Sequence, residues 1–186
     1  MKNASLRRAR RAAASLALTG ALAAAGSTAL AAGGGTSVGG GGDGGGDGSG
    51  GGNAVFPVRA AHSYGDGLGA GRGHQGQDIF ARCGKPVVTA KRGRVKLVDY
   101  DGAAGNYVVI AGRRKAKDTV YMHLKAPSKL REGKRVQAGE KVGRVGTTGR
   151  ATGCHLHFEM WSNPGWYSGG RPVDPKPSLK RWDRNS

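Results

Sequence analysis

The chain has 186 residues, 36 of them glycine, and a formal net charge of +18 at pH 7. A chain of this length holds one folded domain with additional segments. Its charge suits a polyanionic partner. However, only 6% of its residues are aromatic and no platform for stacking bases is evident, which argues against a nucleic-acid-binding protein.

Residues 1–32 are predicted to be a signal peptide. Residues 1–11 are basic, residues 12–30 are uncharged and rich in alanine, and an A-x-A cleavage pattern ends at Ala31. A membrane anchor is the alternative, but alanine dominates the segment, and threonine, serine and glycine interrupt it. Two arginine pairs in the basic part leave twin-arginine export open beside the general route.

Residues 33–53 consist mostly of glycine and cannot form a packed core, so we expect a flexible linker. Residues 54–186 remain as one folded domain, large enough for a sizeable core. We expect this domain to be secreted or held in the cell envelope after cleavage, and to be monomeric.

Basic residues gather in three parts of the domain, residues 91–94, 113–117 and 129–135. On an exported protein these clusters predict attraction to anionic polymers of the cell wall. The alternative is a solvated surface that only keeps the protein soluble.

Short runs rich in β-branched and aromatic residues alternate with glycine-containing turns along the domain. They predict strands over residues 86–90, 95–100, 107–111, 119–124, 141–147 and 155–161. Helical periodicity is scarce, so any helix should be short. The pattern indicates an all-β fold, a single small antiparallel β-sheet or sandwich domain.

The last of these runs places two histidines on one face. Because side chains alternate in a strand, the apolar residues of "HLHFEM" should form a core face. His155, His157 and Glu159 should share the opposite face, so two imidazoles point into one space. Cys154 lies on the core side, which argues against it as a metal ligand or nucleophile.

The run "TVYMHL" predicts a third imidazole at the same place. Val120, Met122 and Leu124 should form its apolar face, with Tyr121 and His123 turned the other way. If the two strands are neighbours, His123 lines a polar floor shared with the first two histidines.

Glycines around His74 and Asp78 argue against a helix, so His74 should lie on a loop and Asp78 at the start of a strand. Zinc in a catalytic site takes about three protein ligands and keeps one position for water. His74, Asp78 and one of His155 or His157 would supply such a set. The alternative is a group of half-buried histidines bonded only to the backbone.

The two cysteines, Cys83 and Cys154, are predicted to form a disulfide, because the domain is expected outside the cytoplasm. The bridge would tie together the two segments that carry the candidate ligands.

Three motifs resemble, in order and spacing, the lysostaphin-type (LytM-type) zinc endopeptidases: "GHQGQDIFARCGKPVVTAKRGRV", "VYMHL" and "GTTGRATGCHLHFEM". The resemblance runs from about residue 56 to residue 174. It implies a small antiparallel β-sheet domain with an open groove. It also implies a peptidase that hydrolyses peptides of bacterial peptidoglycan, in the stem or the cross-bridge.

The resemblance extends to the roles of individual residues. By this resemblance His74, Asp78 and His157 bind one zinc ion per chain. His123 and His155 would be the catalytic pair, which moves protons and steadies the developing oxyanion.

Other polar residues map less directly onto the family. Tyr64 is a possible counterpart of a tyrosine that some relatives carry, Glu159 is interpreted as structural, and His62 has no assigned role. The competing function is a non-catalytic wall-binding module that regulates another hydrolase. Such modules usually lack ligands, and here every ligand position is filled.

Overall fold

The computed structural model of the chain describes residues 54–71, 73–113 and 116–185. The predicted signal peptide (1–32) and linker (33–53) lie outside the described residues. Ten strands and one helix occupy the described part. Within these residues, no helix is long and apolar enough to cross a membrane.

Eight of the described strands form one antiparallel sheet. Their order is β1-β2-β9-β6-β5-β4-β7, and β10 also pairs with β9. The strands are β1 (His62–Tyr64), β2 (Gln77–Ala81), β4 (Gly93–Asp101), β5 (Gly105–Gly112), β6 (Asp118–Leu124), β7 (Arg135–Val136), β9 (His155–Trp161) and β10 (Pro172–Val173). All neighbours in the sheet are antiparallel, so the predicted all-β antiparallel fold is confirmed.

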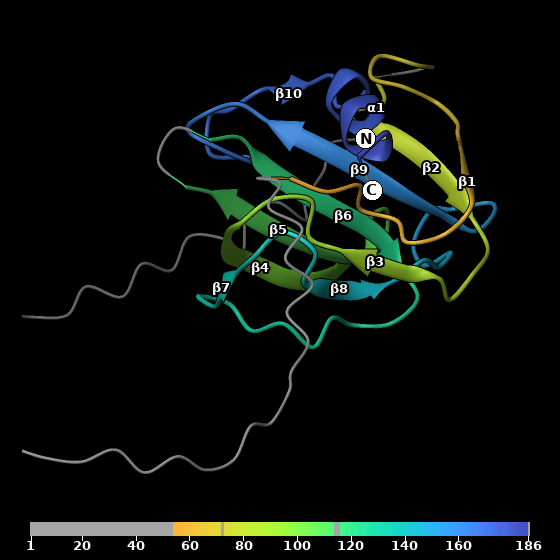
Figure 1. Cartoon of the computed structure of the whole chain (residues 1–186), viewed down its shortest axis with the longest axis horizontal. Coiled ribbons are helices and arrows are strands. Elements are labelled where there is room, and N and C mark those ends of the chain that lie inside the picture. The colour runs from red at the N-terminus through yellow and green to blue at the C-terminus, as the bar shows by residue number, and fades with distance from the viewer. Residues whose placement is uncertain (1–53, 72, 114–115, 186) are drawn as a thin grey trace, which may run out of the picture. The chain divides into compact units, whose positions relative to one another are not determined.

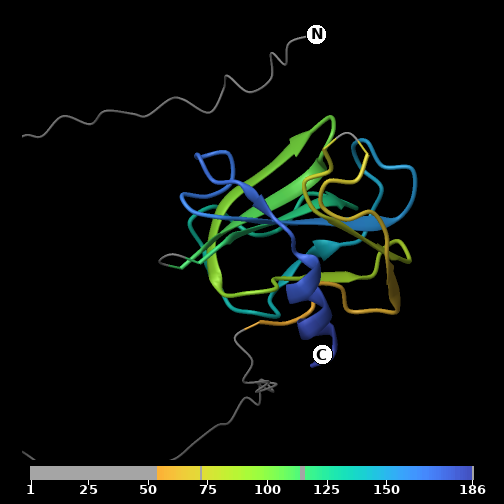
Figure 2. The same cartoon turned by 90° about the horizontal axis from the view of Figure 1, so that it is seen from above.

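A second layer covers one face of this sheet. Strand β3 (Pro86–Val88) pairs with β8 (Lys141–Arg144) in a two-stranded ribbon, and helix α1 (Lys176–Asp183) follows the last strand. Figure 1 shows the ribbon and α1 in front of the large sheet, and Figure 2 shows them below it. The main apolar cluster draws residues from both layers and from α1. Its members include Phe56, Val87, Ile110, Leu156, Phe158 and Leu179.

The opposite face of the large sheet carries a smaller apolar cluster. Tyr107, Val109, Val120 and Trp161 are buried together there. The histidines of β9 lie on this face as well, because they alternate along the strand with residues of the main core. The sheet therefore separates the main core from a buried, partly polar face.

All six predicted strands are present, with some bounds shifted. Strand β9 begins and ends where it was predicted, whereas the run predicted over 141–147 ends at Arg144. Strands β1, β7 and β10 were not predicted, because they have only two or three residues, too few for alternation to show. The helix is short, as expected, and buries Leu179 and Trp182 on one side.

Candidate metal centre

The two strands that carry Asp78 and the histidine pair lie side by side. Strands β2 and β9 are antiparallel neighbours, with Asp78 directly opposite His157. Residues opposite each other point to the same face of a sheet, so this register brings the carboxylate beside the imidazoles of His155 and His157. The next pair, Ile79 and Leu156, points the other way into the main core.

Three side chains converge on one point of this face. His74 Nε2 lies 3.1 Å from Asp78 Oδ1, and His157 Nδ1 lies 2.9 Å from the same oxygen. The candidate ligand atoms of these three residues all lie within 4.8 Å of one another. His155 Nε2 is farther from Asp78 Oδ1, at 3.7 Å. Of the two histidines that the strand pattern left open, His157 is the one in this donor cluster of His74, Asp78 and His157.

His74 reaches the donor cluster from a loop, as predicted. Its Nδ1 donates to the Gly67 carbonyl at 2.9 Å. The loop is closed by backbone hydrogen bonds from His74 to Ala70 (3.1 Å) and from Gly69 back to His74 (2.8 Å). In the neutral ring, this hydrogen bond places the hydrogen on Nδ1 and leaves the lone pair of Nε2 toward the carboxylate.

His123 reaches the same face through an irregularity that simple alternation does not predict. The predicted faces of β6 were right for His123 and Leu124 but wrong for the residues before them. Val120 and Met122 pack with the smaller cluster on the site face, whereas Tyr121 and Leu124 belong to the main core. The register between β5 and β6 shifts between Tyr121 and Leu124, and His123 there has a φ of 60°. This β-bulge turns the imidazole toward the site.

The loop after β8 holds His123 in place. His123 Nδ1 donates to the Thr148 carbonyl at 2.8 Å, which leaves Nε2 as an acceptor. Two glycines with positive φ allow this approach. A Cβ on Gly105 would meet the Thr148 carbonyl oxygen at 2.3 Å, and one on Gly149 would meet the Gly105 nitrogen at 2.2 Å. The ring of His123 lies 4.7 Å from that of His155, centroid to centroid, so the two form a pair beside the donor cluster.

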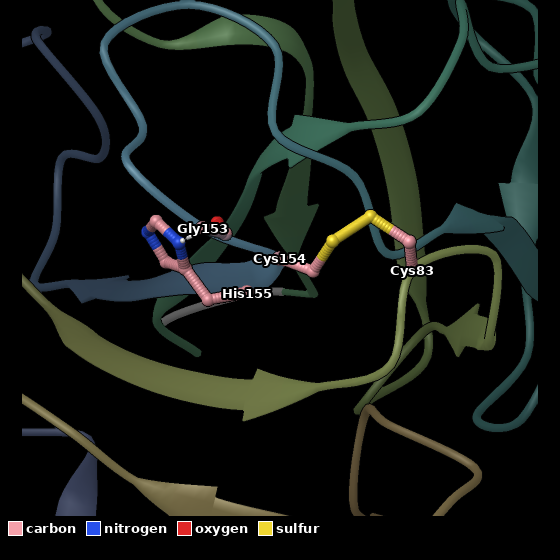
Figure 3. The surroundings of a disulfide bond; sticks show 4 residues. All are labelled: Cys83, Gly153, Cys154 and His155. Carbon is pink, nitrogen blue, oxygen red and sulfur yellow. Dashed lines mark hydrogen bonds between the residues drawn. A yellow bond between two sulfur atoms is a disulfide. The ribbon is translucent and has the colours of Figure 1, made fainter.

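His155 is oriented by the chain that enters β9. Its Nδ1 donates to the Gly153 carbonyl at 2.9 Å, and the preceding residue is bonded to Cys83 in the disulfide Cys83–Cys154. Figure 3 shows the His155 ring pointing away from that disulfide. Cys154 packs against the main core, on the side that the strand pattern predicted. The bridge joins the start of β9 to the segment that follows β2.

His157 uses its two ring nitrogens in the reverse order from the other three histidines of the site. In His74, His123 and His155, Nδ1 is bonded to a backbone carbonyl, whereas in His157 it is Nδ1 that faces the donor cluster. Its Nε2 faces Glu159 Oε1 at 3.1 Å, and its Nδ1 faces Asp78. Glu159 is only 2% exposed. The strand pattern correctly predicts that Glu159 shares the face of His157. The direct hydrogen bond from Glu159 to a candidate ligand could not be predicted from that pattern.

The close charges shift several pKa values. Burial alone would raise the pKa of Asp78, but the hydrogen bond and charge of His157, with two further histidines, lower it. Burial alone would lower the pKa of His157, but hydrogen bonds and charges from Asp78 and Glu159 raise it to about 9. Burial lowers the pKa of His123 to about 4, although the carbonyl that it contacts opposes this.

Two residues with open roles lie away from the donor cluster. His62 Nδ1 donates to the Ala60 carbonyl at 3.0 Å, and its Nε2 lies 3.3 Å from Asp183 Oδ2 at the end of α1. Tyr64 packs against the main core and is opposite Ile79 in the register of β1 with β2. Both residues therefore support the fold at its edge.

The donor cluster fits a zinc ion. Two imidazole nitrogens and one carboxylate oxygen are ligand types that zinc takes in catalytic sites, with a fourth position kept for water. In the neutral tautomer that donates from Nδ1 to Gly67, His74 Nε2 turns its lone pair toward Asp78 Oδ1. A cation between these two atoms would interact favourably with both.

The model of a known family matches this chain. The family described as Peptidase family M23 matches residues 72–175, more than half of the chain. The chain belongs to peptidase family M23. The matched residues include the donor cluster and the pair of His123 and His155, and the resemblance to lysostaphin-type peptidases is confirmed.

Two curated relatives share the M23 region. An uncharacterised metalloprotease of Haemophilus influenzae is 40% identical over 105 residues, which are 56% of this chain and 20% of the relative. The peptidoglycan DD-endopeptidase ShyC of Vibrio cholerae is 38% identical over 92 residues, which are 50% of this chain and 21% of the relative. The match thus spans about a fifth of the length of these relatives.

Solved structures share the fold of the M23 region. The catalytic domain of the antimicrobial peptidase lysostaphin from Staphylococcus simulans has 30% identity and a TM-score of 0.58, over 64% of this chain and 92% of that chain. A zinc containing peptidase from Vibrio cholerae has 34% identity and a TM-score of 0.56, over 65% of this chain and 39% of that chain. The M23 region therefore has a lysostaphin-like fold.

Proposed function

We propose that this M23 chain is an exported zinc endopeptidase that hydrolyses peptide bonds in bacterial peptidoglycan, in the stem peptide or the cross-bridge. The observation that supports it most directly is the donor cluster of His74, Asp78 and His157 with a second histidine pair beside it. The relative named peptidoglycan DD-endopeptidase supports the same class of substrate.

His74, Asp78 and His157 would hold one zinc ion per chain, through Nε2, a carboxylate oxygen and Nδ1. When bound, zinc polarises the scissile carbonyl and activates water for attack. Two of these ligands make a hydrogen bond through the ring nitrogen that does not face Asp78. His74 donates to the Gly67 carbonyl, and His157 donates to the Glu159 carboxylate. Partners of this kind fix the ring orientation of histidine ligands.

His123 and His155 would move protons and stabilise the developing oxyanion. Each ring uses its Nδ1–H for a backbone carbonyl and keeps Nε2 for the reacting groups. Burial lowers the pKa of His123 to about 4, so near neutral pH the ring is neutral and its Nε2 carries a lone pair. The short distance between the two rings lets both act on one reacting group.

Export would bring the domain to this substrate. The support is the basic and alanine-rich segment over residues 1–32, together with the disulfide Cys83–Cys154, a bond that persists in oxidising compartments. N-terminal sequencing of the protein outside the cytoplasm should find a new terminus near Ala31. An intact N-terminus on cytoplasmic protein alone would contradict export with cleavage.

A basic surface would hold the enzyme on anionic cell-wall polymers. Described residues from all three basic clusters lie at one end of the large sheet. Gly93 pairs with Gly112, which precedes Arg113, on one side and with Val136, which follows Arg135, on the other. The exposed residues Arg94 and Arg135 are direct neighbours across β4 and β7. Like charges placed opposite each other destabilise a sheet, and a bound polyanion offsets that cost.

Sedimentation with purified walls at increasing salt tests this surface. Replacing Arg92, Arg94 and Arg135 by Gln should weaken binding to walls that keep their anionic polymers, but not to walls stripped of them. The matched control replaces three other exposed cations, which lie outside the three basic clusters. They are Arg82, Lys85 and Lys125. An equal loss in both triple variants would mean that total charge matters and this surface does not.

Digestion of purified peptidoglycan tests the activity itself. The full chain should release peptides with new amino termini, stop when a chelator is added, and resume when zinc is returned. The competing function, a non-catalytic wall-binding regulator of another hydrolase, predicts binding to the walls without release of peptide.

A further inference from the structure

The carboxylate behind His157 satisfies three donors at once. Glu159 Oε1 accepts from His157 Nε2 at 3.1 Å, while Oε2 accepts from two indoles, Trp161 Nε1 at 2.7 Å and Trp166 Nε1 at 3.1 Å. An indole nitrogen can only donate a hydrogen bond. Both oxygens of Glu159 therefore serve as acceptors.

The chain packs tightly around this carboxylate. A Cβ on Gly76 would come within 2.9 Å of His157 Nε2 and 3.0 Å of Glu159 Cγ, so a glycine at this position lets the backbone cover the hydrogen bond. Glu159 is 2% exposed and Trp161 is 3% exposed. Protein groups must therefore supply the hydrogen bonds that water would otherwise provide.

The second indole is itself anchored by the loop after β9. The backbone N–H of Trp166 donates to Asp118 Oδ2 at 3.0 Å, and a Cβ on the preceding Gly165 would meet the same oxygen at 2.4 Å. The rings of Tyr107 and Tyr167 lie 5.6 Å and 4.7 Å from that of Trp166, centroid to centroid. The indole is thus held where it can fix Glu159 Oε2.

We propose that Glu159 is a positioning residue that selects the tautomer of His157. An acceptor at Oε1 requires the hydrogen of the neutral ring on Nε2, which leaves the lone pair on Nδ1, the nitrogen that faces Asp78. Nδ1 is the atom that would bind zinc, so this inference rests on the proposed function. Glu159 is not itself a ligand, because both of its oxygens accept hydrogen bonds on the side of the His157 ring away from Asp78.

Glutamine has the shape of this side chain but cannot accept hydrogen bonds from all three donors. Its amide offers an acceptor on one side and a donor group on the other. With the NH₂ group toward His157, the ring must accept at Nε2 and carry its hydrogen on Nδ1, where a metal needs the lone pair. With the NH₂ group toward the indoles, the two indole N–H groups lose their acceptor.

Zinc affinity, measured on the full chain by competition with a chelator, tests the proposal. Glu159→Gln should bind zinc about 10- to 100-fold more weakly, which is the loss typical of a removed partner behind a ligand. Glu140→Gln is the matched control, because it makes the same change at a carboxylate that pairs with Lys134 away from the donor cluster. The control should keep full affinity. If the unsubstituted chain binds zinc and Glu159→Gln binds it equally tightly, the proposal about Glu159 is wrong while the proposed function stands.

A nitrogen-resolved NMR spectrum of the zinc-loaded, unsubstituted chain adds a test that does not depend on the folding of a variant. His157 should carry zinc on Nδ1 and a slowly exchanging hydrogen on Nε2. Zinc on Nε2 would overturn the proposal whatever the variants do. An unsubstituted chain that binds no zinc at all would overturn the proposed function as well.

Discussion

The two faces of strand β9 are almost equally buried but hold opposite kinds of side chain. Leu156 and Phe158 on the core face are 0% exposed, while His155 and His157 on the other face are each 7% exposed. Buried apolar side chains need only close packing. Buried polar side chains need a partner for each donor and acceptor, and on this face those partners set the direction of every ring. The supply of hydrogen bonds, more than burial, therefore distinguishes the site from the core.

Removing a proposed ligand should have the largest effect. His74→Ala, Asp78→Ala and His157→Ala should each lose zinc and detectable wall hydrolysis, because three protein ligands become two. Each should also be less stable near the site, since metal binding contributes folding free energy. Elemental analysis and wall digestion measure both effects. Full zinc content in all three variants would refute the ligand assignment.

Removing a member of the histidine pair should separate catalysis from metal binding. His155→Ala and His123→Ala should keep zinc but lose activity by about a hundredfold or more, because they remove groups that transfer protons and stabilise charge. Zinc content and wall digestion should be measured beside His157→Ala. If His155→Ala loses its zinc while His157→Ala keeps it, the two roles are exchanged.

The disulfide Cys83–Cys154 should stabilise both faces by anchoring the start of β9. The bridge closes a loop with a sequence separation of 71. Chain entropy predicts a loss of about 4 kcal/mol in the free energy of unfolding when both cysteines become serine, often less in practice. Urea unfolding measures the loss. Two free thiols in the unreduced, denatured native protein would refute the bridge.

A substitution on the core face of β9 should affect stability alone. Leu156→Ala removes a fully buried side chain and should lower the free energy of unfolding by about 3 kcal/mol. The folded fraction should still bind one zinc per chain. A Leu156→Ala variant with normal stability and no zinc would contradict the claim that the core face of β9 contributes to stability while the opposite face binds zinc.

The smallest expected effect near neutral pH is the pH dependence that His123 adds to the stability of chelator-treated protein. Its pKa is about 4 in the folded chain, against 6.5 as the ordinary value. The unfolded chain therefore binds the proton first as the pH falls. His123 should lower stability progressively between about pH 6.5 and pH 4 and have no effect above about pH 7.

The variant His123→Asn isolates this contribution, because asparagine tolerates the positive φ at this position. The difference in unfolding free energy between the two proteins should change only within that pH window. A difference that stays constant across the window would contradict the lowered pKa.

The regular parts of the fold and site could be predicted from the sequence. Alternation along β9 correctly placed Leu156 in the core and His157 on the opposite face. Glycines correctly argued for a loop at His74. These predictions succeeded because local periodicity and backbone preference decide them.

The irregular and long-range parts could not be predicted in this way. Before the bulge at His123, Val120 and Tyr121 lie on the faces opposite to those expected, and the bulge accompanies a loop that brings the Thr148 carbonyl to the ring. The three donors on Glu159 come partly from Trp166, on a loop that pattern reasoning does not place. Both features depend on which segments meet in three dimensions, which no single run of sequence shows.

Peptide release from purified peptidoglycan tests most directly the claim that the polar face of β9 is a zinc peptidase site. Mass spectrometry should find products cut at a peptide bond by the full chain, none after chelation, and the same products again after zinc is returned. Zinc-loaded His155→Ala should release almost none. Release that persists in the chelator, or no release by a chain carrying its full zinc, would contradict the account.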